Sequence, residues 1–133
     1  GQLLPDEGSL AYWRVLEWLM WQMGGVGPML GQAHHFLRYN KGISEYAEER
    51  YLNETLRLYS VLDKRLSVGE YLADDYSIAD IATWPWVSRY EWHQVELGRF
   101  PNVKRWYQSI AERAAVQRGY HIPHRVNDVP MPG

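Results

Sequence analysis

Apolar side chains recur every three or four positions in four stretches of the chain, which is the spacing of a buried helix face. The stripe is most regular between Ser44 and Ser67, where its members are Tyr51, Leu52, Leu56, Tyr59, Leu62 and Leu66. No convincing alternation of apolar and polar residues, which is typical of a half-buried strand, lies between these stretches. The pattern therefore predicts an all-α fold in the form of a helical bundle.

The first stretch predicts a helix with an interruption. The helix is expected to run from Ser9 to Met23 and to resume through Phe36 and Tyr39. The segment between them, GGVGPM, contains three glycines that loosen the backbone and Pro28, which lacks an N–H. We therefore expect a kink or break there. A phosphate-binding loop is not expected, because the Gly-Lys-Ser/Thr ending and a preceding strand are missing.

The two later helices have distinct start signals. Ser77 and Asp80 have the spacing of a capping box, in which the side chain of each residue satisfies a free backbone N–H of the other. This helix is expected to run toward Trp92, with a bend at Pro85. The fourth helix is expected to follow Pro101. Its predicted buried face consists of Val103, Trp106, Tyr107, Ile110 and Ala114.

Composition excludes several classes of function. Among the 133 residues, 14 are basic and 16 acidic, so the net charge is −2 and gives no sign of a nucleic-acid-binding surface. The chain has no cysteine, which excludes disulfides, thiolate metal sites and a cysteine nucleophile within it. No apolar run is long enough to span a membrane. Seven Trp and ten Tyr against two Phe indicate many half-buried aromatic surfaces.

Residue chemistry alone does not predict a catalytic centre. His34 and His35 are adjacent and would point about 100° apart on a helix, so we expect no metal site there. No serine has a nucleophile–base arrangement, and no catalytic residue is predicted. A buried Asp80 could be a perturbed acid, but its capping position favours a structural role. Arg50 precedes Glu54 by four positions, which favours a surface ion pair between them.

Several longer strings resemble a known family. DYSIADIATWPWV and FPNVKRWYQSI are similar to the C-terminal helical domain of cytosolic glutathione transferases. WLMWQMGGVGPMLGQAHHF and EYAEERYLNETLRLYSVLDKRL closely resemble the nu-class, bacterial disulfide-bond oxidoreductase branch. The resemblance covers roughly residues 3–118. It implies a linker remnant over residues 1–8, the helical domain over residues 9–118 and an irregular tail over residues 119–133.

The resemblance also implies a division of labour. Members of the family carry an N-terminal thioredoxin-like domain that binds most of glutathione and activates its thiol, and the resemblance implies that the sequence from Gly1 onward holds none of that domain. The chain is therefore expected to be inactive alone and to belong to a cytoplasmic, homodimeric parent that uses glutathione as cosubstrate and no metal. Arg50 matches the family position where an arginine contacts glutathione. From their spacing we also expect a substrate-pocket wall, formed by Trp21, Gly24, Gly25, Pro28 and Met29.

Two functions are therefore considered. The first is a glutathione-dependent transferase or disulfide-bond reductase of which this chain is the acceptor-substrate half. The alternative is a stand-alone all-α protein-interaction module derived from a glutathione transferase. Nucleic acid and membranes are expected partners of neither.

Overall fold

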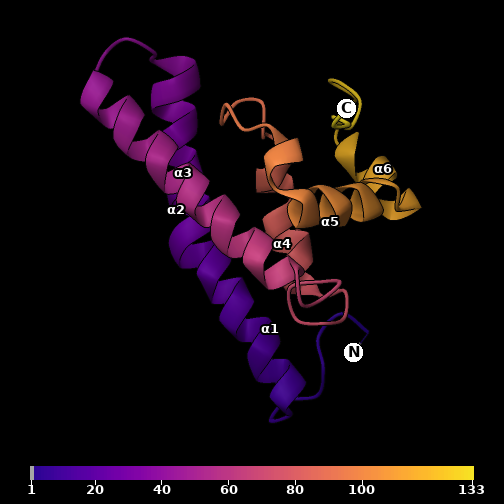
Figure 1. Ribbon diagram of the computed structural model, residues 1–133. Helices are drawn as coiled ribbons and strands as arrows, with labels where there is room; N and C mark the ends of the chain where they lie inside the picture. The colour runs from indigo at the N-terminus through magenta and orange to yellow at the C-terminus, as the bar shows by residue number, and fades with distance from the viewer. Residues whose placement is uncertain (1) are drawn as a thin grey trace.

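The computed structural model describes residues 2–133 and shows an elongated helical bundle (Figure 1). The helices within this range are α1 (Leu10–Trp21), α2 (Gly27–Ala33), α3 (Glu45–Leu66), α4 (Ile78–Val87), α5 (Pro101–Ala111) and α6 (Ala114–Tyr120). Two π-helical segments, η1 (Gln22–Val26) and η2 (His34–Tyr39), and a short 3₁₀ helix, η3 (Leu97–Arg99), complete them. The described residues form no strands; two isolated β-bridges lie within the segment that connects α3 to α4. The predicted all-α bundle is confirmed.

The first helix is not broken at GGVGPM. Val26 and Gly27 keep right-handed helical angles, with φ/ψ of −58°/−56° and −55°/−57°. The turn widens instead, and the Gly27 N–H donates to the carbonyl of Gln22, five residues back. The wider turn directly precedes Pro28, whose ring would clash with the carbonyl four residues earlier in a regular α-helix. A π-turn therefore accommodates the proline where the sequence predicts a kink or break.

The second predicted helix is confirmed as α3. Its N-cap is Ser44, whose hydroxyl accepts the Ala47 N–H at 3.3 Å. At its other end, Arg105 of α5 donates to the carbonyls of Leu66 at 2.8 Å and Gly69 at 3.1 Å. These bonds satisfy backbone oxygens that a helix terminus leaves without partners.

The later boundaries differ from the predictions. α4 ends at Val87 rather than near Trp92, and turns follow up to Gln94, which has a positive φ of 57°. α5 ends at Ala111, so Ala114 does not continue its buried face but begins α6 and is exposed. The periodicity of apolar residues does not reveal these helix ends, because apolar residues continue beyond each of them.

The core takes side chains from the first helical run (Val15, Val26 and Leu30) as well as from α3, α4 and α5, and its largest buried side chains lie on α3 and α5. Trp106 and Tyr107 of α5 and Tyr59 of α3 are almost entirely inaccessible to solvent. The Trp84 ring stacks on Tyr107 with a centroid distance of 5.0 Å, and its indole N–H donates to the Tyr107 carbonyl at 3.1 Å. Five of the seventeen Trp and Tyr side chains are thus core, and the polar atoms of Tyr59, Trp84, Trp106 and Tyr107 are hydrogen-bonded.

A capping box begins α4. The Ser77 hydroxyl accepts the Ala79 N–H, and the Asp80 carboxylate accepts the Ser77 N–H at 3.0 Å. Asp80 is fully buried and also accepts the Leu72 N–H at 3.0 Å and the Trp106 indole N–H at 2.8 Å. One carboxylate thus joins the α3–α4 connection, the start of α4 and the centre of α5.

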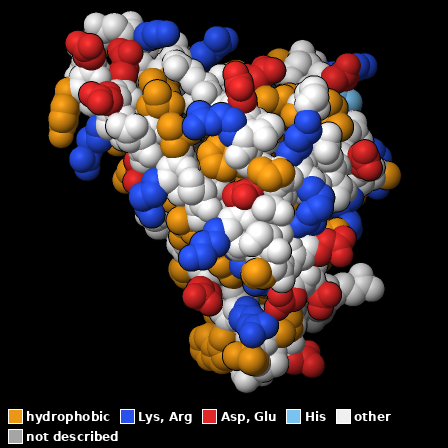
Figure 2. Space-filling view, viewed as in Figure 1, with side chains coloured by type: hydrophobic (Ala, Val, Ile, Leu, Met, Phe, Trp, Pro, Cys, Tyr) orange, Lys and Arg blue, Asp and Glu red, His pale blue; other side chains and the backbone are white. Residues whose placement is uncertain are grey.

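The surface carries charges of both signs. Figure 2 shows basic and acidic side chains interspersed over one face, with hydrophobic side chains gathered at the end where α1 begins. Leu10 and Trp13 of α1 are 70% and 58% exposed. No helix in the described part of the chain is both long and apolar enough to cross a bilayer.

Candidate functional site

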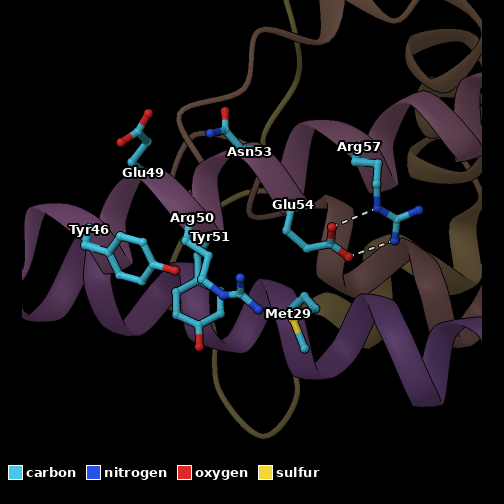
Figure 3. A pocket seen from close by; sticks show the side chains of 8 residues that line it. All are labelled: Met29, Tyr46, Glu49, Arg50, Tyr51, Asn53, Glu54 and Arg57. Carbon is cyan, nitrogen blue, oxygen red and sulfur yellow. Dashed lines mark hydrogen bonds and ion pairs between the residues drawn. The ribbon is translucent and has the colours of Figure 1, made fainter.

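An open cavity of about 700 Å³ lies beside the first half of α3 (Figure 3). Its residues come from successive turns on one side of α3 and from the facing α2, and they are Met29, Tyr46, Glu49, Arg50, Tyr51, Asn53, Glu54 and Arg57. α3 is held against the first helical run by stacking of Tyr51 on Phe36, with a centroid distance of 5.5 Å. The volume is in the range of small-ligand sites.

Arg50 does not pair with Glu54, contrary to the expected surface ion pair. The Glu54 carboxylate instead accepts two bonds from Arg57, from Nε and Nη2, each at 2.7 Å. The Arg57 bond and, to a smaller extent, the charge of Arg50 hold the pKa of Glu54 below its ordinary value. The side chain of Arg50 makes no hydrogen bond or ion pair with any residue of the described range and is exposed.

The cavity can therefore hold an anion. In Figure 3 the Arg50 guanidinium lies between the Tyr51 ring and Met29, and the Glu54 carboxylate points away from it. A guanidinium presents N–H donors in a planar fork that matches a carboxylate. Tyr46 and Tyr51 add hydroxyls and ring surface, and Met29 adds an apolar contact. The arrangement favours a carboxylate that carries some apolar surface.

The structure separates the five predicted pocket-wall residues. Met29 lines the Arg50 cavity, whereas Trp21 lies against the core and borders a cavity of about 10 Å³ with Leu30 and Leu58. Gly25 also faces Leu58, since a Cβ there would lie 3.7 Å from that side chain. Gly24 and Pro28 are exposed and do not line the Arg50 cavity.

The π-turn explains this separation. The grouping of these residues assumed one α-helical repeat from Trp21 to Met29. The π-turn over Gln22–Val26 adds one residue to a turn, which rotates the following positions by about 100° relative to that repeat. The role of these five residues as an acceptor-pocket wall stays a prediction.

A pair of histidines, His93 buried and His34 half-buried, was missed by sequence reasoning. His34 Nε2 and His93 Nε2 are 2.7 Å apart, and the Tyr59 hydroxyl lies 3.0 Å from His93 Nδ1. The two imidazole rings stack with centroids 4.8 Å apart. His34 and His93 are far apart in sequence and belong to different elements, so no local spacing reveals the pair.

Burial fixes the protonation of this pair. It lowers the pKa of His93 to about 3, with a further contribution from His34, and raises the pKa of Tyr59 well above its ordinary value. Burial, and then the charge of Arg89, lower the pKa of His34. Both imidazoles and the Tyr59 hydroxyl are therefore neutral near pH 7, and one of the two Nε2 atoms donates its proton to the other across the 2.7 Å contact. Within residues 2–133, no group of three or more His, Cys, Asp or Glu side chains could hold a metal ion.

Comparison with known proteins identifies the family. Residues 26–114 match the family described as "Glutathione S-transferase, C-terminal domain". The chain is 50% identical over 102 residues to the disulfide-bond oxidoreductase YfcG of Escherichia coli K12, an overlap that spans 76% of this chain and 47% of that protein. The chain spans about half the length of the curated relatives it matches first.

Solved structures agree with this match. A glutathione transferase from Pseudomonas putida, with one glutathione disulfide per subunit, superposes with a TM-score of 0.84 at 40% identity, covering 92% of this chain and 56% of that one. A glutathione transferase from Burkholderia graminis, with two glutathione molecules per subunit, gives 0.84 at 38% identity, covering 94% and 55%. The chain therefore belongs to the glutathione S-transferase C-terminal domain family.

Proposed function

We propose that the chain is the acceptor-substrate half of a glutathione-dependent transferase or disulfide-bond reductase, and that Arg50 anchors a carboxylate of glutathione. The observation that carries this proposal is the exposed Arg50 guanidinium, which has no hydrogen bond or ion pair within residues 2–133 and lines an open cavity. The relatives support it, because those named above are a disulfide-bond oxidoreductase and glutathione transferases that contain glutathione or its disulfide.

The division of work follows from the side chains present. Glutathione has two carboxylates, and the Arg50 fork can hold one through two parallel N–H···O bonds. Reduction of a disulfide requires glutathione thiolate to attack a sulfur, with the displaced thiolate as leaving group, and this step needs no protein cysteine. The chain has none. Lowering the pKa of the glutathione thiol is assigned to a thioredoxin-like domain of the intact protein, which we propose is a cytoplasmic homodimer.

The isolated chain is expected to show no turnover. Residues 2–133 offer an anchoring cation and a cavity, and activation of the glutathione thiol is assigned to the thioredoxin-like domain. Glutathione-dependent reduction of a small dialkyl disulfide should stay at the uncatalysed rate with this chain and rise when a thioredoxin-like domain is joined to its N-terminus. Turnover by the chain alone would contradict the proposal.

Arg50→Ala in the two-domain protein should weaken glutathione binding more than about tenfold, because bonds to a charged group contribute about 1.5–3 kcal/mol. Isothermal titration calorimetry measures this change. Arg99→Ala is the matched control, because Arg99 is also exposed but lies on η3 and does not line the cavity. Equal affinities for Arg50→Ala and the unmodified protein would remove Arg50 from the binding site.

The interaction-module alternative is not favoured. The relatives and structures described above carry transferase or oxidoreductase names, and the match extends over the residues that line the cavity. Light scattering of the isolated chain checks the alternative, which requires self-association or a partner chain.

A further inference from the structure

Two arginines on α3 can reach Glu54. Arg50 precedes it by one helical turn and Arg57 follows it by three residues, and both spacings bring side chains together on a helix. The carboxylate bonds to Arg57 through both of its oxygens. Figure 3 shows Glu54 turned toward Arg57, with the Arg50 side chain extending to the other side, toward Met29.

Helix geometry favours this choice of partner. A pair with the acid on the N-terminal side of the base is stronger than the reverse order, because it opposes the helix dipole. Glu54–Arg57 has the favoured order, and Arg50–Glu54 has the reverse. Two parallel bonds from one guanidinium also exceed what a single contact supplies. The Glu54 side chain is 29% exposed and the Arg57 side chain 59% exposed. The acid of this ion pair is therefore better shielded from water than the base.

We infer that Arg57 is a positioning residue for Arg50: by holding the Glu54 carboxylate it keeps the Arg50 guanidinium available to an anionic ligand. The inference rests on the proposed function of Arg50 as the glutathione anchor. Without Arg57, the nearest cation on the same side of α3 is Arg50. A ligand carboxylate would then have to displace Glu54 from Arg50 before it could bind.

Calorimetric titration of the full-length protein with reduced glutathione tests the inference. Arg57→Ala should weaken binding about two- to fivefold, the range set by an exposed ion pair that must break first. The double variant Arg57→Ala/Glu54→Gln should restore the original affinity, because no carboxylate remains to occupy Arg50. Arg57→Ala/Glu49→Gln is the control for net charge. It also removes one acidic cavity residue but leaves Glu54 in place, so it should stay weak.

A second measurement reports on Glu54 directly. NMR titration should find the pKa of Glu54 still below its ordinary value in Arg57→Ala, because Arg50, whose charge already lowers that pKa, becomes its ion-pair partner. The pKa should return to its ordinary value only in Arg50→Ala/Arg57→Ala. A return already in Arg57→Ala, or rescue by Glu49→Gln as complete as by Glu54→Gln, would overturn the positioning role.

The two proposals fail differently. If Arg50→Ala leaves glutathione affinity unchanged, Arg50 is not the anchor and the proposed function of the site is wrong. If Arg50→Ala weakens binding but Arg57→Ala does not, the anchor stands and the positioning role of Arg57 is wrong.

Discussion

Asp80 satisfies polar groups from three parts of the chain with one side chain. Its two oxygens accept the Leu72 and Ser77 backbone N–H groups and the Trp106 indole N–H. Burial raises the pKa of Asp80, and these donors lower it in part. Each donor is itself in the interior, so loss of the carboxylate leaves several N–H groups without water or partner.

Asp80→Asn should therefore destabilise the fold by about 3 kcal/mol, because the amide NH₂ would face donors where an acceptor is needed. Urea unfolding followed by circular dichroism measures the change. Asp75→Asn is the matched control at an exposed position of the preceding turn and should stay within about 0.5 kcal/mol of the unmodified chain. Equal effects of the two substitutions would show that Asp80 has no special structural role.

At this scale the sequence predicted what is local. The Ser77 and Asp80 spacing identified the capping box because its bonds join residues three apart. The contacts of Asp80 with Trp106 and of Arg105 with the end of α3 join distant segments and have no local signal. Arg50 was singled out by resemblance, and its role as the glutathione anchor stays a prediction; whether it bonds to Glu54 depends on which of two arginines the carboxylate selects.

His34 of η2 and His93 of the turns after α4 are joined by one hydrogen bond, which requires a proton on only one of the two facing nitrogens. His93 Nε2 and His34 Nε2 lie 2.7 Å apart, so only one of them can carry a proton there. Arg89 and Arg38 lie over the neighbouring Trp92 ring, at 4.9 and 5.3 Å from its centroid, and add positive charge around the pair. A second proton would place two N–H groups face to face and drive these elements apart.

Stability should therefore fall as the medium is acidified. The folded pKa of His93 is about 3, below its ordinary 6.5, so the unfolded chain binds the proton first. The contribution of neutral His93 is complete above about pH 6.5 and is lost progressively toward about pH 3. Between about pH 7.5 and pH 5 the loss should be on the order of 2 kcal/mol.

Urea unfolding of the unmodified chain, His93→Gln and His35→Gln at these two pH values measures the effect. His93→Gln should be less stable at neutral pH and less sensitive to acid. His35→Gln should keep the original pH dependence, because His35 is exposed. An undiminished acid sensitivity in His93→Gln would assign it to other groups.

Helices were predicted better than their ends. α3 was recovered from Ser44 to Ser67 because the helix is amphipathic, but its predicted stripe only in part: Tyr59, Leu62 and Leu66 are buried, whereas Tyr51, Leu52 and Leu56 are half-buried. The end of α4 was placed too late, since Tyr90 and His93 stay buried within turns and imitate a continuing helix face. Where a turn is buried, its residues are as apolar as those of the helix before it, so the sequence pattern does not mark the helix end.

Over the whole molecule, the C-terminal tail is a packed segment although it lacks regular structure. Val129 is 6% exposed, and the Pro130 carbonyl accepts the Tyr107 hydroxyl at 2.6 Å. Burial raises the pKa of Tyr107 well above its ordinary value, so this donor stays protonated at any ordinary pH. Lys104 also donates to the carbonyl of Gly133. The tail predicted as irregular is thus fixed to α5.

Tyr107→Phe should release the tail while preserving the ring stack on Trp84. We expect a loss of about 1 kcal/mol in global stability and faster protease cleavage after residue 120. Limited proteolysis followed by mass spectrometry locates the cuts. Tyr39→Phe, at a 65% exposed ring, is the control and should leave the pattern unchanged. Identical cleavage patterns would mean that Val129 alone holds the tail.

Because the first helical run contains two π-turns, the loss of a single residue would change the rotation of one part of the run relative to the next. Removing one residue from Gln22–Val26 would return that turn to α geometry and rotate α1 by about 100° against α2. Val15 would swing out of the core, and Met29 could keep its place beside Arg50 only if α1 lost its own contacts. Loops usually tolerate insertions and deletions, but this helical run cannot change length without changing which of its residues face the core. A single-residue deletion there should be as damaging as a core substitution.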